Sequence, residues 1–147
     1  MQRVDFYVLD GSDGRERLRF ACRIIDKAFE AEQRVLVCLD NAAELAGFDD
    51  LLWTFAQDSF VPHEPIGAAS DWEETPVLLS CGPGHATAAD VLVNLGNTVP
   101  VEAARTNSII EVIDGDAGRR QAGRLRYRQY KEMGVEPTTH KLGGDTG

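Results

Sequence analysis

The feature that most constrains the fold is a regular alternation of short apolar runs with longer stretches of helical periodicity. Five apolar runs have the length of strands: residues 4–10, 34–40, 76–81, 90–95 and 108–114. Between the first two runs, four residues recur at three- and four-residue spacing, as on one helix face: Leu18, Cys22, Ile25 and Phe29. Strands that alternate with helices predict an open α/β sheet of the Rossmann-like type, mostly parallel, with helices on both faces.

Capping and turn residues divide the rest of the chain. Asn41 is a plausible N-cap for a helix over residues 41–55, residues 99–106 favour a short helix, and a final helix is expected over about residues 118–133. The intervening segment 57–74 is rich in Pro, Gly and Ser and is typical of a loop. A chain of 147 residues fits one domain, so we predict a single α/β domain over residues 1–134 and a flexible C-terminal tail over residues 135–147.

The charge of the chain restricts its partners. The formal net charge is −9, which argues against direct, tight binding of nucleic acid, because phosphate binding depends on positive charge. No segment has the length and apolar character of a membrane span, and the N-terminus does not have the pattern of a secretory signal. Three cysteines are an odd number, and two lie in apolar runs, so we expect a soluble protein of the reducing cytoplasm.

The usual catalytic motifs of α/β proteins are missing. Gly11 and Gly14 follow the first strand, but the third glycine of a dinucleotide fingerprint and the lysine of a P-loop are absent, so no nucleotide cofactor is predicted. An alternative function is Mg²⁺-dependent phosphotransfer by Asp10, Asp40 and Asp114, which all follow predicted strands. The competing interpretation is that each aspartate opens a turn or caps a helix. No zinc site or catalytic nucleophile is predicted.

The segment 119–131 has the opposite charge to the rest of the chain. It contains six Lys and Arg residues and no Asp or Glu. On a helix, one face would carry four residues, Arg120, Arg124, Tyr127 and Lys131, while Ala122, Leu125 and Met133 would pack against the sheet. Guanidinium groups beside a tyrosine suit an acidic peptide with an aromatic end, whereas Arg126 would lie away from this face. A merely solvated helix face is the alternative.

A second candidate surface is the aromatic segment where the second helix ends. Trp53, Phe60, Val61 and Pro62 lie close together in the sequence. Packing under a long loop would explain them, but Trp and Phe at a helix exit are also typical of interface hot spots. We therefore predict an exposed apolar patch for a protein partner.

Taken together, these segments resemble the chi subunit of bacterial DNA polymerase III. The resemblance rests on "DFYVLD", "RVLVCLDNAAELAGFDDLLWTF", "DSFVPHEPIG" and "RLRYRQYKEMG". It implies a non-catalytic accessory subunit of the clamp-loader assembly that binds the acidic C-terminal tail of single-stranded DNA-binding protein. By position, Arg124 and Tyr127, with Arg120 or Arg119, would bind the tail. Trp53, Phe60 and Pro62 would face the psi subunit, with a helicase or another replisome protein as the alternative partner.

Overall fold

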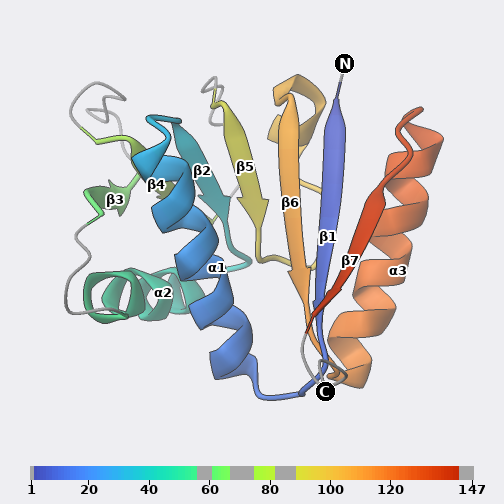
Figure 1. The fold of residues 1–147 in the computed structure, drawn as a ribbon, viewed down its shortest axis with the longest axis horizontal. Helices are drawn as coiled ribbons and strands as arrows, with labels where there is room; N and C mark the ends of the chain where they lie inside the picture. Colours follow the sequence, from blue (N-terminus) through green and yellow to red (C-terminus); the bar gives the residue numbers. More distant parts are fainter. Residues whose placement is uncertain (1, 56–60, 67–74, 82–88, 143–147) are drawn as a thin grey trace.

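The computed structural model describes residues 2–55, 61–66, 75–81 and 89–142. Its single sheet has the strand order β3-β4-β2-β5-β6-β1-β7, and every neighbouring pair is parallel (Figure 1). The strands are β1 (Arg3–Leu9), β2 (Val35–Cys38), β3 (His63–Pro65), β4 (Val77–Ser80), β5 (Val91–Asn94), β6 (Ser108–Ile113) and β7 (Thr138–Leu142). The predicted open parallel α/β sheet is confirmed.

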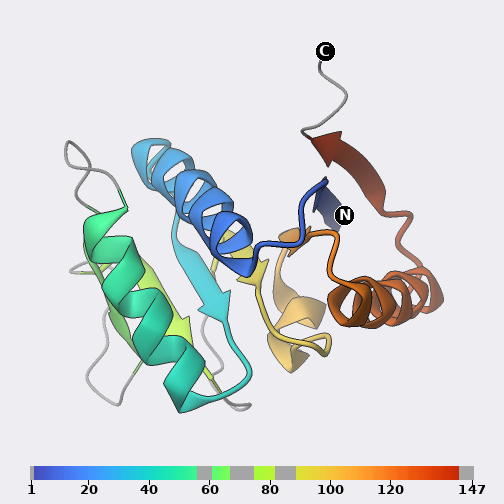
Figure 2. The ribbon, with the colours of Figure 1, turned by 90° about the horizontal axis from the view of Figure 1, so that it is seen from below.

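The helices cover both faces of this sheet. They are α1 (Gly14–Glu30), α2 (Ala42–Thr54), α3 (Ala117–Glu132) and the short 3-10 helix η1 (Val101–Arg105). Residues of α1 and α2 share one core on one face of the sheet, and residues of α3 and η1 share the core on the other face. Seen from below, α1 and α3 lie on opposite sides of the central strands (Figure 2). Side-chain oxygens of Asp13, Asn41 and Asp116 accept hydrogen bonds from backbone N–H groups of the first turns, so each long helix begins at a capping residue. Among the described residues, no helix has the length and hydropathy needed to cross a membrane.

Alternating residues of the central strands supply two hydrophobic cores. In β2, Val35 and Val37 face the core under α1 and α2, and Leu36 and Cys38 face the core under α3. All four are buried, as expected for a parallel strand covered on both faces.

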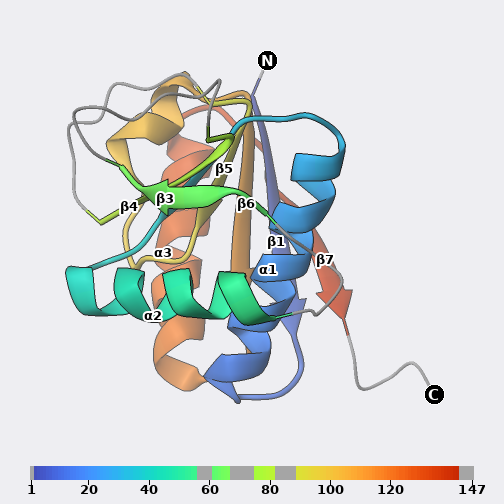
Figure 3. The same ribbon diagram turned by 90° about the vertical axis from the view of Figure 1, so that its left-hand side faces the viewer.

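The two edge strands were not predicted from the sequence. Segment 138–142, assigned above to a flexible tail, forms β7 and pairs with β1 from Asp5–Thr138 to Leu9–Leu142. Its His140 ring stacks on Tyr7 with centroids 4.6 Å apart, and His140 Nε2 lies 2.9 Å from Asp5 Oδ1. At the other edge, His63–Pro65 forms β3 within the expected loop (Figure 3). Both strands are short and partly polar, as is common at sheet edges. Because neither contains an apolar run, the sequence carries no signal for them.

The predicted face of the last helix was wrong in part. Leu125 and Met133, which we expected to pack, are 54% and 43% exposed. Three other residues of α3 are buried instead: Gly123, Arg126 and Tyr130. Arg126 turns inward because a buried carboxylate, Glu111 of β6, lies beneath it.

Candidate functional site

A groove runs between α3 and the β1–β7 edge of the sheet. It consists of two adjoining depressions of about 630 and 350 Å³, which share Val8, Ile113 and Arg124. All four residues of the predicted binding face line it: Arg120 and Arg124 in the smaller depression, and Arg124, Tyr127 and Lys131 in the larger. The described structure thus brings the predicted basic and aromatic residues to one concave surface. We call this surface the α3 groove.

The base of the α3 groove is apolar and closely packed. Phe6 of β1 contacts the rings of Tyr127 and Tyr130, at centroid distances of 5.4 and 5.9 Å. Gly123 allows α3 to approach the sheet, because a Cβ atom at this position would lie 2.9 Å from Ile113 Cδ1. The groove therefore has a fixed apolar base beside exposed cations.

Basic side chains from two elements rim this apolar base. Arg124, Arg128 and Lys131 are exposed along α3, and Lys141 reaches the rim from β7. Lys131 Nζ lies 3.8 Å from Glu136 Oε2, but both side chains are more than half exposed, so the pair restrains the lysine only weakly. Lys141 was missed from the sequence because residues 135–147 were assigned to a tail.

Arg120 rather than Arg119 belongs to the α3 groove. Arg120 Nε donates to the Asp114 carbonyl oxygen at 3.1 Å, and the side chain lines the groove. Arg119 lies on the side of α1, where Nε and Nη2 each donate to the Asp114 carboxylate at 2.8 Å. Burial alone would raise the pKa of Asp114, but the hydrogen bonds from Arg119 and from the Asp116 backbone lower it. Of the two arginines, only Arg120 thus lines the α3 groove.

A buried polar network fixes α3 against the sheet behind the groove. The Glu111 carboxylate accepts hydrogen bonds from Arg126 Nε at 2.9 Å, Tyr130 OH at 2.7 Å and Asn94 Nδ2 at 2.9 Å. Burial raises the pKa of Glu111, and the charge of Arg126 and these hydrogen bonds oppose that effect. Arg126 also donates to the Asn97 carbonyl oxygen, so α3 is joined to β6 and to the segment that follows β5. Arg126 is therefore a structural residue that holds α3 against the sheet.

The three strand-end aspartates do not converge. Asp40 Oδ1 accepts from the Asn97 backbone at 2.9 Å, Asp114 pairs with Arg119, and Asp10 is exposed. Within the described ranges, no group of three or more His, Cys, Asp or Glu side chains is placed to hold a metal ion. The convergence that the phosphotransfer alternative requires is therefore missing: Asp40 and Asp114 serve the local structure, and Asp10 lies at the smaller depression of the α3 groove.

The aromatic segment is partly exposed at the far edge of the sheet. Trp53 is 45% exposed, and its ring lies over His63 with centroids 4.1 Å apart. The prediction that Val61 lies on an exposed patch is wrong, because its side chain packs in the core under α1 and α2. Pro62 is half-buried, and Phe60 lies outside the described residues. His63, which was not among the predicted residues, joins this segment to α2. Its Nε2 lies 3.0 Å from Asp49 Oδ1.

Comparison with known proteins assigns the family. The family described as DNA polymerase III chi subunit, HolC, matches residues 1–138. The chain belongs to this family. DNA polymerase III subunit chi of Pseudomonas aeruginosa is 32% identical over 97% of this chain and 98% of its own length. The Haemophilus influenzae chi subunit is 26% identical over 95% of this chain and 97% of its own length. The resemblance noted in the sequence is confirmed.

The fold itself is shared beyond the chi family. A DEAD box protein from Methanococcus jannaschii matches 96% of this chain with a TM-score of 0.60 and 12% sequence identity. This chain spans 42% of that protein. At this level of identity, the match shows a common α/β architecture and carries no information on function.

Proposed function

We propose that this chi-family protein links the polymerase III clamp loader to single-stranded DNA-binding protein by holding the acidic C-terminal tail of that protein in the α3 groove. The observation that carries the proposal is the groove itself. An apolar depression is rimmed by Arg120, Arg124, Lys131 and Lys141 in a chain whose net charge is −9. Membership of the chi family places the chain in DNA replication and supports this partner.

The chemistry of the groove suits a peptide that carries carboxylates and ends in an aromatic residue. The aromatic ring would pack on Val8, Ile113 and Tyr127, of which Val8 and Tyr127 are partly exposed in the free protein. Arg124 stands where the two depressions meet, so it can receive a carboxylate bidentately while the ring fills the base. Each such charged hydrogen bond contributes about 1.5 to 3 kcal/mol. In this proposal the protein acts by tethering and catalyses no reaction.

We further propose that the surface around Trp53 and Pro62, called the Trp53 surface, binds a second protein, either the psi subunit or another replisome or helicase partner. Trp53 supports this role because a large aromatic side chain is 45% exposed. The surface lies toward the β3 edge, whereas the α3 groove lies toward the β7 edge (Figure 1). Both partners could then bind at the same time.

Fluorescence anisotropy with a labelled tail peptide tests the proposal. Arg124→Ala should weaken binding about tenfold or more, because 1.4 kcal/mol corresponds to a factor of ten. Arg23→Ala is the matched control, since it removes the same charge from an exposed position on α1. Equal affinities for the two variants, or tighter binding of bare single-stranded DNA than of the peptide, would contradict the proposal.

A further inference from the structure

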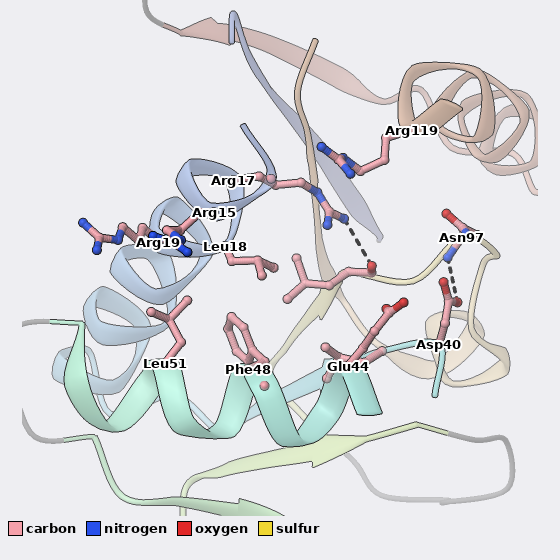
Figure 4. A pocket seen from close by; sticks show the side chains of 14 residues that line it. Arg15, Arg17, Leu18, Arg19, Asp40, Glu44, Phe48, Leu51, Asn97 and Arg119 are labelled. Carbon is pink, nitrogen blue, oxygen red and sulfur yellow. Dashed lines mark hydrogen bonds between the residues drawn. The ribbon is translucent and has the colours of Figure 1, made fainter. Parts of the chain in front are cut away.

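A separate cavity of about 720 Å³ lies between α1 and α2, at the carboxyl edge of the parallel strands. It shares no lining residue with the α3 groove. Leu18, Phe48 and Leu51 point toward one another between the helices, and the guanidinium groups of Arg17 and Arg119 lie at one end (Figure 4). Its size and its place at the strand ends are typical of small-molecule sites in α/β proteins.

Arg17 is a buried cation on the wall of this cavity. It is 8% exposed, and Nε and Nη2 donate to the carbonyl oxygens of Val112 and Leu95 at 2.7 and 3.1 Å. Burial is the main cause that lowers the pKa of Arg17 to about 10, and repulsion from Arg119 adds to it. The group therefore still carries its charge at neutral pH. No carboxylate among the described residues lies within ion-pair distance of Arg17. The guanidinium donates to neutral carbonyl oxygens, and Asp114 and Glu111, whose charges raise its pKa, lie beyond ion-pair distance, so an anion in the adjoining space would be stabilised.

Arg119 offers a second guanidinium to the same space. Its Nε and Nη2 bind Asp114, and no described residue accepts a hydrogen bond from Nη1. Four arginines and only two carboxylates line the cavity, although the chain as a whole is acidic: Arg15, Arg17, Arg19, Arg119, Asp40 and Glu44. Arg15 and Arg19 extend away from the other two arginines (Figure 4). Two adjacent guanidinium groups match the several oxygens of a phosphate.

Gly47 is an exposed residue of α2 that lines the opposite side of the cavity. It lies in the interior of α2, where glycine is disfavoured relative to alanine. A Cβ atom at Gly47 would meet nothing within 4 Å, so the packing of the protein itself does not require a glycine. Gly47 lines the cavity together with the apolar side chains of Leu18, Phe48 and Leu51. At the rim, the Glu44 carboxylate points into the cavity (Figure 4) and can accept hydrogen bonds from hydroxyl or amino groups.

We propose that the α1–α2 cavity binds a nucleoside monophosphate. The phosphate would lie between Arg17 and Arg119, the base would pack against Phe48 and Leu18, and sugar hydroxyls would donate to Glu44. A longer phosphate chain fits less well at the start of α1, because the Asp13 carboxylate already accepts the Arg15 N–H there and would repel an anion.

Titration of the labelled protein with adenosine monophosphate, followed by two-dimensional amide NMR, tests this proposal. Signals of Leu18, Gly47, Phe48 and Asn97 should shift, and the nucleotide should bind at least tenfold more tightly than adenosine or inorganic phosphate alone. Gly47→Leu should fill the cavity and weaken binding at least tenfold. Ala46→Leu, at a neighbouring exposed position that does not line the cavity, should leave binding unchanged.

Shifts that fall outside the cavity, no shifts at millimolar nucleotide, or equal binding by the Gly47→Leu variant would each overturn the proposal. The amide spectrum of Gly47→Leu also reports whether that variant is folded. Its affinity for the tail peptide should match that of the unmodified protein, because the α3 groove shares no residue with the cavity. Failure of the nucleotide site is thereby distinguished from failure of the tethering function.

Discussion

Replacement of Arg126 by alanine should destabilise the protein severely, because it removes one member of a buried ion pair. Arg126 and Glu111 have side chains that are 2% and 0% exposed, with Nε and Oε1 separated by 2.9 Å. The substitution leaves the Glu111 carboxylate buried with only Tyr130 and Asn94 as partners. Removal of one member of a buried ion pair costs about 3 to 5 kcal/mol, a large share of the stability of a single domain.

The loss of unfolding free energy caused by Arg126→Ala should depend on pH. Burial raises the pKa of Glu111 in the folded protein, and Arg126 opposes this rise. Without Arg126 the folded-state pKa rises further, so the folded variant takes up a proton as the pH falls toward the ordinary range of a glutamate. A carboxyl group with a raised folded-state pKa stabilises the folded state at low pH, and this contribution is lost as the pH increases. The difference in unfolding free energy between wild type and variant should therefore be smaller at pH 5 than at pH 8.

Urea unfolding followed by circular dichroism measures both effects. The double variant Arg126→Ala/Glu111→Gln is the informative control, because it also removes the buried charge and should be more stable than Arg126→Ala alone. A cost below about 1 kcal/mol at pH 8 would refute the argument, because an unpaired buried charge cannot cost so little. A double variant less stable than Arg126→Ala alone would refute it as well.

Three further predictions follow from the packing. Gly123→Ala should lower the unfolding free energy by about 1 to 3 kcal/mol, because its Cβ would lie 2.9 Å from Ile113 Cδ1. It should also weaken binding of the tail peptide; calorimetry measures the first effect and fluorescence anisotropy the second. Truncation after Pro137 removes β7 and should speed amide hydrogen exchange in β1, whereas unchanged exchange would contradict the pairing. Burial raises the pKa of Cys22 and of Cys38 to about 12, so both thiols should resist a disulfide reagent at pH 8 until the protein unfolds.

The central strands and long helices could be predicted because their signals are local. Val35, Val37 and their neighbours form an uninterrupted apolar run, and Asn41 caps α2 through its own side chain. The edge strands gave no such signal, since β7 reads Thr-Thr-His-Lys-Leu and is held by backbone pairing with β1 and by the Tyr7–His140 stack. Long-range partners of this kind cannot be inferred from the residues of the strand alone.

The candidate groove was predictable on one side only. Helical periodicity placed Arg124 and Tyr127 on one face, and both line the groove. The same periodicity placed Arg126 on the opposite side of the helix but could not reveal its buried partner, because Glu111 lies in β6 and is 15 residues earlier in the chain. Lys141 was missed for a similar reason, because its position depends on the pairing of β7 with β1.

Photo-cross-linking tests the central claim, that the α3 groove holds the acidic tail, most directly. The terminal aromatic residue of a synthetic tail peptide is replaced by a benzophenone analogue, and the cross-linked residues of the intact protein are identified by mass spectrometry. We predict cross-links to Val8, Ile113 and Tyr127, which would be lost in the presence of excess unmodified peptide. Cross-links that gather instead around Trp53, or in the cavity between α1 and α2, would contradict the claim.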